Sequence, residues 1–268
     1  MVGGPGLSAY DLPTLDKIPV IQEMMPMDDT GLALDIGIGT GYTTRAVFGS
    51  RPTVCVDIDA ANLDGFRARF AARPDARGPL CVIALATALP FKSGSFRFIL
   101  CSEVLEHLED DDTAAGELAR VLAPVGIAII TVPFTGLGFT SFLELLGIKT
   151  VHDFPGPERH VRRGYDVRSL SGLLARHDLV IERHAYWFRL FTRLVTDCVS
   201  VVHLLYERIV HRRRAWTWPD VSAVEGEPMF RLYALVFPAL WAVSRLDRFL
   251  RSRRGFGLVA LVRRRQGS

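Results

Sequence analysis

The fold of this chain is decided by residues 34–42, which read LDIGIGTGY. An apolar segment, residues 32–36, leads into these glycines, and a helix-like segment, residues 43–48, follows them. Glycine at such a turn allows the backbone to bend sharply and to approach a ligand without a Cβ in the way. A strand, a glycine-rich turn and a helix in this order predict the first unit of an α/β sheet with a ligand site at its carboxyl edge.

The same alternation continues along the chain. Short apolar segments, often β-branched, are typical of buried parallel strands, and the segments between them have helical periodicity. We expect strands at residues 32–36, 53–58, 80–85, 98–101, 127–132, 179–184 and 256–262. We expect helices at residues 15–25, 43–48, 61–71, 103–108, 114–122 and 167–177. This order predicts a doubly wound α/β sheet.

The composition suits one globular core with an appendage. The chain has 268 residues, of which 49% are hydrophobic and 23% charged, and these values exclude a disordered, collagen-like or disulfide-scaffold protein. The net charge of +3 is unevenly distributed. Residues 1–183 sum to −6, whereas residues 184–268 carry 15 arginines and sum to +9. An acidic body with a basic C-terminal third indicates an anionic partner, either a membrane surface or a nucleic acid.

An acid further along the chain fits a nucleoside ligand. Asp57 lies 20 residues after Gly37, near the end of the second expected strand. An acid at that position can accept hydrogen bonds from both ribose hydroxyls, although Asp57 could instead cap the next helix, as Asp59 could. A dinucleotide-binding loop requires a third glycine at position 42, where this chain has Tyr42. The spacing therefore disfavours a nicotinamide-dependent oxidoreductase.

Four stretches and the last strand resemble the class I S-adenosylmethionine-dependent methyltransferases that act on small molecules. The stretches are LDIGIGTGYTT, VCVDIDAANL, ALPFKSGSFRFILCSEVLEHLED and ARVLAPVGIAIITVP, and the last strand is FGLVALVRR. The resemblance covers about residues 30–185 and resumes at residue 256. It implies a Rossmann-like methyltransferase fold: a doubly wound, seven-stranded, mostly parallel sheet with one antiparallel strand at its edge. It also implies S-adenosylmethionine as the cofactor.

The resemblance assigns cofactor-binding roles by position. Gly37, Gly39 and Gly41 are expected close to the methionine and ribose parts of the cofactor. Asp35 is expected to face its ammonium group, often through water, and Asp57 its ribose hydroxyls. All five residues lie at the ends of the first two expected strands, so they are predicted to line one side of one site.

Further positions follow from the resemblance, and two depart from the family pattern. Ala86 is expected beside the adenine, and Ser102, with Cys101, beside the methyl-transfer site. Many relatives carry an acid at the position of Leu85 and an Asp at the position of Arg97. These departures leave open the alternative of a non-catalytic, methyltransferase-like interaction protein.

An acid–histidine group follows the fourth expected strand. Glu103, Glu106 and His107 are spaced i, i+3, i+4, so they would share one face of a helix over residues 103–108. His107 is then a candidate general base, with Glu103 assisting deprotonation of the acceptor. The alternative, which the sequence leaves open, is a structural helix that only packs beside the cofactor.

A divalent metal held by this group, with His160 or His152 as a further ligand, is the least favoured alternative, and we expect no metal. Some relatives that methylate quinone precursors or RNA 3′ ends do use such an arrangement. His160 and Tyr165 lie in a loop that would reach the carboxyl edge of the sheet. We therefore expect both to position the substrate.

Residues 187–254 form an apolar, arginine-rich insertion before the last strand, and residues 1–186 and 255–268 form the methyltransferase core. Two expected helices, residues 187–210 and 230–250, mix apolar and aromatic residues with arginine. Such faces fit either a helix lying in a membrane interface or a cap over the active site. The sequence has no RNA-binding signature, which makes nucleic acid the least favoured partner.

The four cysteines form no CxxC pair, and three of them lie in apolar runs, as expected of free thiols in a reducing cytoplasm. The first residues lack a basic start and an apolar region, so no secretory signal is expected.

We predict a cytoplasmic S-adenosylmethionine-dependent methyltransferase, peripheral on the inner face of the membrane. Its acceptor is expected to be a small apolar or lipid-like molecule that is methylated on oxygen.

Overall fold

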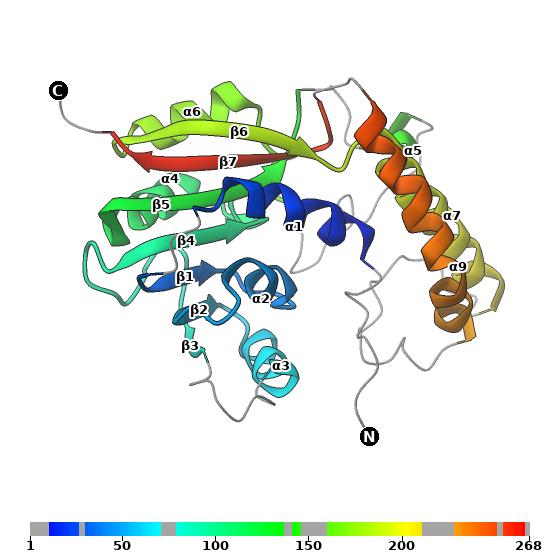
Figure 1. The fold of residues 1–268 in the computed structure, drawn as a ribbon, viewed down its shortest axis with the longest axis horizontal. Helices are drawn as coiled ribbons and strands as arrows, with labels where there is room; N and C mark the ends of the chain where they lie inside the picture. Colours follow the sequence, from blue (N-terminus) through cyan, green and yellow to red (C-terminus); the bar gives the residue numbers. More distant parts are fainter. Residues whose placement is uncertain are drawn as a thin grey trace.

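The computed structural model describes residues 11–26, 30–70, 79–136, 141–145, 160–210, 228–250 and 254–265. Its sheet has the order β3-β2-β1-β4-β5-β7-β6 (Figure 1). The strands are β1 (Ala33–Ile36), β2 (Thr53–Asp57), β3 (Leu80–Ile83), β4 (Phe96–Ser102), β5 (Leu122–Pro133), β6 (Leu179–Trp187) and β7 (Gly257–Arg264).

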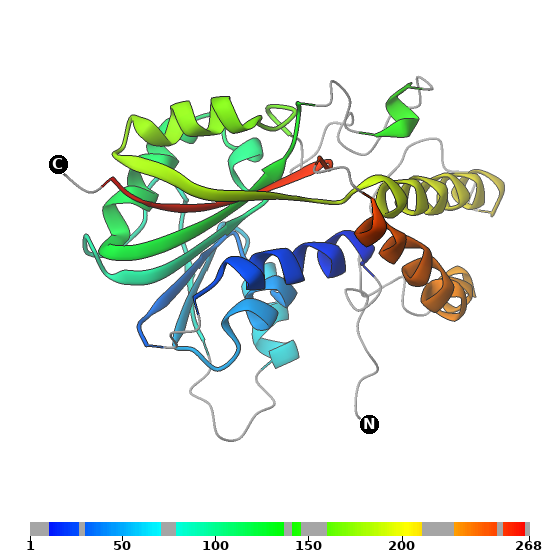
Figure 2. The same ribbon diagram turned by 45° about the horizontal axis from the view of Figure 1, so that its top comes forward.

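Helices lie on both faces of this sheet. Figure 2 shows α4 and α6 on one face and α1, α2 and α3 on the other, which confirms the doubly wound prediction. The α-helices are α1 (Leu12–Met24), α2 (Tyr42–Phe48), α3 (Ala60–Phe70), α4 (Asp111–Val121), α5 (Phe142–Leu145), α6 (Val167–Ala175), α7 (Leu190–Val210) and α9 (Pro228–Ser244). The described residues also form the 3-10 helices η2 (Leu105–His107) and η4 (Arg245–Phe249).

The sheet is seven-stranded and mostly parallel, as the resemblance implies. Strands β1 to β5 pair in parallel, and β7 runs antiparallel to both β5 and β6. The antiparallel strand therefore lies one position inside the sheet, and the prediction that it forms the edge is wrong. It lies there because β7 pairs on both of its sides and leaves β6 as the outer strand.

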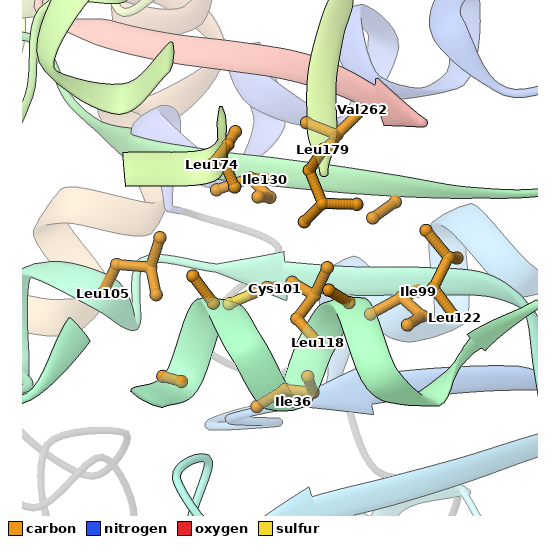
Figure 3. Close-up of a cluster of buried hydrophobic side chains, with 14 of the residues drawn as sticks. Ile36, Ile99, Cys101, Leu105, Leu118, Leu122, Ile130, Leu174, Leu179 and Val262 are labelled. Carbon is orange, nitrogen blue, oxygen red and sulfur yellow. The ribbon is translucent and has the colours of Figure 1, made fainter. Parts of the chain in front are cut away.

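Side chains along the central strands point alternately to the two faces of the sheet, and the apolar ones form a separate cluster on each face. Leu118 of α4 and Leu174 of α6 belong to the half that contains Ile36, Cys101 and Ile130 (Figure 3). The other half is built on α1 and α2 and contains Phe98, Leu100, Ile127, Ile129, Ile21 and Phe48. Successive strand residues point to opposite faces, so the last residue on each strand reaches a defined helix layer.

The helix expected over residues 103–108 is wrong. Only the three residues of η2 are helical, and Glu103 has a φ of 55°. A right-handed helix does not accommodate this left-handed conformation, so the chain turns sharply after β4. The three residues therefore do not share an exposed helical face. Glu106 is fully buried, whereas Glu103 and His107 are half-buried.

The helical insertion packs against the core through α1. Leu12 of α1, Val195 of α7 and Phe237 of α9 form one buried cluster, and Figure 1 shows α5, α7 and α9 together beyond one end of the sheet. Trp187, the first residue of the predicted insertion, is the last residue of β6. None of the described helices is both long and apolar enough to cross a membrane.

A buried carboxylate fixes the start of α7. Asp247 of η4 accepts hydrogen bonds from Phe191 N at 2.8 Å, Thr192 N at 2.9 Å and Thr192 Oγ1 at 2.8 Å. The first N–H groups of a helix have no partner within the helix itself. A residue 55 positions away in the sequence therefore supplies the cap and joins the two ends of the insertion.

We expect Asp247→Ala to lower the free energy of unfolding by about 2–4 kcal/mol, because it leaves buried donors without an acceptor. For a chain of this size that corresponds to a fall in Tm of roughly 5–15 °C. Asp247→Asn keeps one acceptor oxygen and should lose about half as much. Thermal unfolding followed by circular dichroism measures both, and equal Tm values for Asp247→Ala and wild type would contradict the role of Asp247.

Candidate functional site

Polar side chains end the three central strands on the face covered by α1 and α2. Ser102 follows Phe98 and Leu100 at two-residue intervals, and Thr131 pairs with Ser102 across β4 and β5. Their hydroxyl oxygens lie 2.9 Å apart. Asp35 of β1 is bound by Thr44 of α2, on the same face. The candidate site therefore lies at the carboxyl ends of these strands, where polar side chains follow the apolar ones on this face.

The glycine loop leaves β1 across the end of β2. Gly37 N donates to Val56 O at 2.8 Å. Gly41 has a φ of 75°, and a Cβ there would lie 2.0 Å from the ring of Phe66. Gly39 also has a positive φ, yet a Cβ there would meet nothing within 4 Å. The loop is therefore packed against the protein at Gly41 and open at Gly39, as a backbone cradle for a ligand requires.

Asp57 fixes this loop and remains able to bind a ligand. One carboxylate oxygen accepts from Gly39 N at 3.1 Å, and the other accepts from Asp59 N at 2.9 Å. Asp59, rather than Asp57, accepts from the N–H of Ala61 in the first turn of α3. Each carboxylate oxygen has a second lone pair. The capping role is thus filled by Asp59, and the ribose role predicted for Asp57 remains compatible with this geometry.

Asp35 is a buried acid with an unused oxygen. Burial raises the pKa of its carboxyl to about 7, although the hydrogen bond from Thr44 and the positive charge of Lys17 lower it. Its Oδ2 accepts from the Thr44 hydroxyl, and its Oδ1 is buried without a hydrogen-bond partner among the described residues. A buried oxygen without a donor costs free energy. A ligand ammonium group is the kind of donor that would satisfy it.

Lys17 of α1 is a site residue that the sequence analysis missed. Its Nζ donates to Ser102 Oγ at 2.9 Å, across 85 residues of sequence. The residue lies on the buried side of α1 with Ile21 and Met24, at helical spacing. The sequence does place a lysine within the apolar stripe of this helix, and that position could have indicated a functional role, because charged side chains seldom occupy the buried face of a helix.

The two positions expected beside the adenine, Leu85 and Ala86, carry no acid. Ala86 is half-buried in the turn after β3, and Leu85 is 50% exposed.

Cys101 of β4 is buried, and burial raises the pKa of its thiol far above the usual range. The Cys101 thiol is therefore held in its neutral form, and the four cysteines are free, as expected.

Glu106, His107 and His160 lie close together in the structure. The predicted helical face had Glu103 in place of His160. The rings of His107 and His160 lie 4.6 Å apart in an edge-to-face arrangement. Glu106 is fully buried, and burial together with the negative charge of Glu103 raises its pKa well above the usual range. Glu103 accepts a hydrogen bond from Thr131 Oγ1 at 2.7 Å.

The same group could hold a divalent cation. Ligand atoms of Glu106, His107 and His160 all lie within 4.8 Å of one another. Neither oxygen of the Glu106 carboxylate has a hydrogen-bond partner among the residues described. One carboxylate and two imidazoles form a donor set that suits zinc or manganese. His152, the other predicted ligand, lies outside the described residues.

Segment 160–165 is held over η2 by Arg162. The backbone N–H groups of Val161 and Arg162 donate to Glu106 O, and the Arg162 guanidinium donates to Leu105 O at 2.7 Å. The hydroxyl of Tyr165 donates to Asp111 Oδ2 at 2.7 Å and accepts from Arg162 at 2.9 Å. Tyr165 is buried with its hydroxyl occupied by these residues. Its role in binding substrate remains a prediction, whereas Arg162 ties the segment that carries His160 to Leu105 and Glu109.

The predicted residues therefore form two groups. Asp35, Gly39, Asp57 and Ser102 lie with Lys17 around the ends of β1, β2 and β4, and His107 meets His160 beside η2. Glu103 connects to the first group through Thr131 and Ser102. The sequence did not reveal Lys17, Thr131 and Arg162, because their contacts depend on residues distant along the chain.

Comparisons with known proteins agree with this geometry. Residues 34–130 match the family model of the methyltransferase domain. A curated relative, the malonyl-(acyl-carrier protein) O-methyltransferase of Halorhodospira halophila, is 38% identical over 117 residues, which are 42% of this chain and 37% of the relative. An uncharacterised methyltransferase-like protein of Schizosaccharomyces pombe is 31% identical over 102 residues. Each match spans little more than a third of the curated relative's length.

Solved structures share the fold at low sequence identity. The (4+2)-cyclase SpnF has a TM-score of 0.58 and 16% identity, over 94% of this chain and 81% of the cyclase. An S-adenosylmethionine-dependent methyltransferase of Mesorhizobium loti has a TM-score of 0.51 and 17% identity, over 92% and 96% of the two chains. The family model, the sheet order and the glycine loop agree that residues 34–130 carry a methyltransferase domain of the class I S-adenosylmethionine-dependent type.

Proposed function

We propose that the protein transfers the methyl group of S-adenosylmethionine, the methyl donor of its family, to an oxygen atom of a small apolar or lipid-like acceptor. The observation that carries the proposal is the loop at Gly39, which is open on its ligand side and flanked by the buried carboxylates of Asp35 and Asp57. A nucleoside with an attached amino acid presents ribose hydroxyls and an ammonium group. These groups match the two carboxylates.

The residues of this chain would act by positioning and by moving one proton. The bound cofactor supplies an electrophilic methyl group on a sulfonium. His107 would take the proton from the acceptor hydroxyl while the new O–CH₃ bond forms and the C–S bond breaks, leaving S-adenosylhomocysteine. Glu103, held by Thr131, is the second candidate for this proton. Positioning of the acceptor accounts for most of the rate in such a transfer.

The nature of the acceptor is supported by two observations. The curated relative from Halorhodospira halophila is an O-methyltransferase that acts on a malonyl group carried by a protein. Helices α7, α9 and η4 also expose large apolar side chains, which include Val202, Leu205, Leu232, Leu235, Trp241 and Phe249. Both features favour an acyl or otherwise apolar acceptor. Alcohol acceptors would need the proton transfer to His107, whereas a malonyl thioester would be methylated on a carboxylate that is already ionised at neutral pH, so both kinds are assayed.

We further propose that the insertion contacts an anionic membrane. Arg245 lies over the Trp241 ring at 4.9 Å, and Arg248 lies over the Phe249 ring at the same distance. Exposed aromatic rings flanked by arginine are typical of interfacial helices. Arg212, Arg213 and Arg214, together with Trp216 and Trp218, extend this pattern in the sequence and lie outside the described residues.

Asp57→Ala should weaken binding of S-adenosylmethionine and S-adenosylhomocysteine by roughly 10- to 100-fold, because it removes a charged acceptor for the ribose hydroxyls. Isothermal titration calorimetry measures both affinities. Asp59→Ala is the matched control, since it removes an acid two residues away that caps α3. NAD(H) is titrated in parallel. Binding of NAD(H) alone, or wild-type affinity of Asp57→Ala for both nucleosides, would refute the proposed cofactor site.

His107→Ala should lower turnover at least roughly 100-fold and leave the affinity for S-adenosylhomocysteine nearly unchanged, because general base catalysis contributes about 10²–10⁴ in rate. Turnover is measured with labelled cofactor and the acceptor that becomes labelled in fractionated cell lipids and small molecules. Equal losses of turnover and affinity would instead give His107 a structural role.

The metal alternative is tested in the same assay. Loss of turnover on dialysis against a chelator, with recovery on addition of Mn²⁺ or Zn²⁺, would make His107 a metal ligand.

Membrane contact should appear as flotation with anionic vesicles that weakens at high salt but does not vanish. Charge–charge attraction is screened beyond about 8 Å at physiological salt, whereas apolar burial survives. Replacing Arg212, Arg213 and Arg214 with Gln should reduce flotation at low salt, and Leu235→Ser with Phe249→Ser should reduce the salt-resistant part. Leu80→Ser, at an exposed leucine of β3, is the control. A wild-type protein that stays in the soluble fraction at low salt would leave the insertion as a cap only.

A further inference from the structure

The crossover between β3 and β4 contains no helix. Residues 84–95 join these two strands, which are separated in the sheet by β2 and β1. A crossover between parallel strands usually contains a helix, whose own hydrogen bonds and packing fix its position. Residues 84–95 form only turns, a bend and the isolated bridge between Leu85 and Ala88. The conformation of this crossover therefore depends on groups that other elements contribute.

An ion pair on α4 holds the crossover. Arg120 donates to both carboxylate oxygens of Glu117, from Nε at 2.6 Å and from Nη2 at 2.8 Å. The pair also binds both backbone groups of Leu89, whose N–H donates to Glu117 at 2.7 Å and whose C=O accepts from Arg120 at 2.8 Å. Arg120 Nη1 donates to Phe91 O at 2.6 Å. Hydrogen bonds to ionised groups are stronger than those between neutral groups, so this is a firm attachment.

The surroundings of the pair favour its ionised form and limit its contact with water. The hydrogen bond from Arg120 holds the pKa of the Glu117 carboxyl below its usual range. The exposed fraction of the side chain is 18% for Glu117 and 34% for Arg120. Leu89 is buried in the same core cluster as Leu118 of α4. Charge and apolar packing thus hold the crossover against α4 at the same point.

The same crossover carries the two positions expected beside the adenine. The side chains of Leu85 and Ala86 have no hydrogen-bonding group, so these positions can contact a base only through apolar surface and backbone groups. Ala88 N donates to Leu85 O at 3.1 Å and closes the turn, and Leu89 follows directly. The placement of the turn, residues 85–88, therefore depends on how Leu89 is held.

We propose that Glu117 and Arg120 are positioning residues for the adenine of the cofactor, because they hold the backbone of Leu89 and Phe91 and with it the turn at residues 85–88. Neither side chain needs to touch the cofactor, since both act through the backbone. Without the pair, the turn would be ordered only when the ligand binds, and that ordering lowers affinity. The proposal rests on the proposed function, because it concerns how the cofactor of that reaction is bound.

The test compares a ligand that has the base with one that lacks it, by isothermal titration calorimetry. S-Adenosylhomocysteine carries adenine, whereas S-ribosylhomocysteine does not. We expect Arg120→Met to weaken S-adenosylhomocysteine by about 10-fold and to leave S-ribosylhomocysteine unchanged. Glu117→Gln keeps an acceptor for Leu89 N and loses the charge, so it should weaken S-adenosylhomocysteine less, by roughly 3-fold. Arg176→Met, which removes an ion pair with Asp112 at the other end of α4, is the control and should alter neither affinity.

Hydrogen–deuterium exchange of residues 84–91 is the second measurement, because it reports on the crossover itself. S-Adenosylhomocysteine should slow this exchange in the wild-type protein, and the free Arg120→Met and Glu117→Gln proteins should exchange faster than free wild type. Should Arg120→Met fail to fold, or S-ribosylhomocysteine bind too weakly to measure, the exchange of wild type and Glu117→Gln decides.

The outcomes separate this proposal from the proposed function. A wild-type protein that does not bind S-adenosylhomocysteine refutes both. If the wild type binds and Arg120→Met weakens both ligands equally, the pair only supports the fold. Wild-type affinity for S-adenosylhomocysteine in both variants, or exchange of residues 84–91 that the ligand does not slow, would overturn the positioning role and leave the proposed function standing.

Discussion

The parallel register of β1 between β2 and β4 is the constraint on which the site depends. β1 has only four residues, all buried, and Asp35 lies opposite Cys55 on one side and Leu100 on the other. This register aligns the carboxyl ends of the three strands. The glycine loop can then donate to Val56 O at the end of β2. A shift of one residue would move Asp35 to the opposite face of the sheet, away from Thr44.

Desolvated carboxylates give the site its electrostatic character. The pKa of Asp35 and the pKa of Glu106 are both raised, in each case chiefly by burial, and Lys17 partly offsets this in both. A bound cation stabilises a site of this kind, because its attraction to the carboxylates offsets part of the free energy lost when they are buried. S-Adenosylmethionine carries a sulfonium and an ammonium. The charge balance of the site is therefore consistent with the proposed cofactor.

Helix α1 connects the insertion to the site. Lys17 reaches Ser102, while the neighbouring Asp16 accepts from Phe188 N at 2.6 Å, directly after β6. Leu12 on the same helix packs with Val195 and Phe237 of the insertion. Helix α1 therefore contacts both the helices of the insertion and Ser102, which is expected beside the methyl-transfer position.

The sequence by itself determined the strands, the glycine loop and the acid at Asp57, because these features depend on local periodicity and on spacing within one βαβ unit. Only the tertiary structure decided the sharp turn at Glu103, the burial of Glu106 and the meeting of His107 with His160. Arg162 places segment 160–165 over η2 through contacts that cross more than 50 residues. Such contacts leave no periodic trace in the sequence, since they depend on which surfaces the packed sheet brings together.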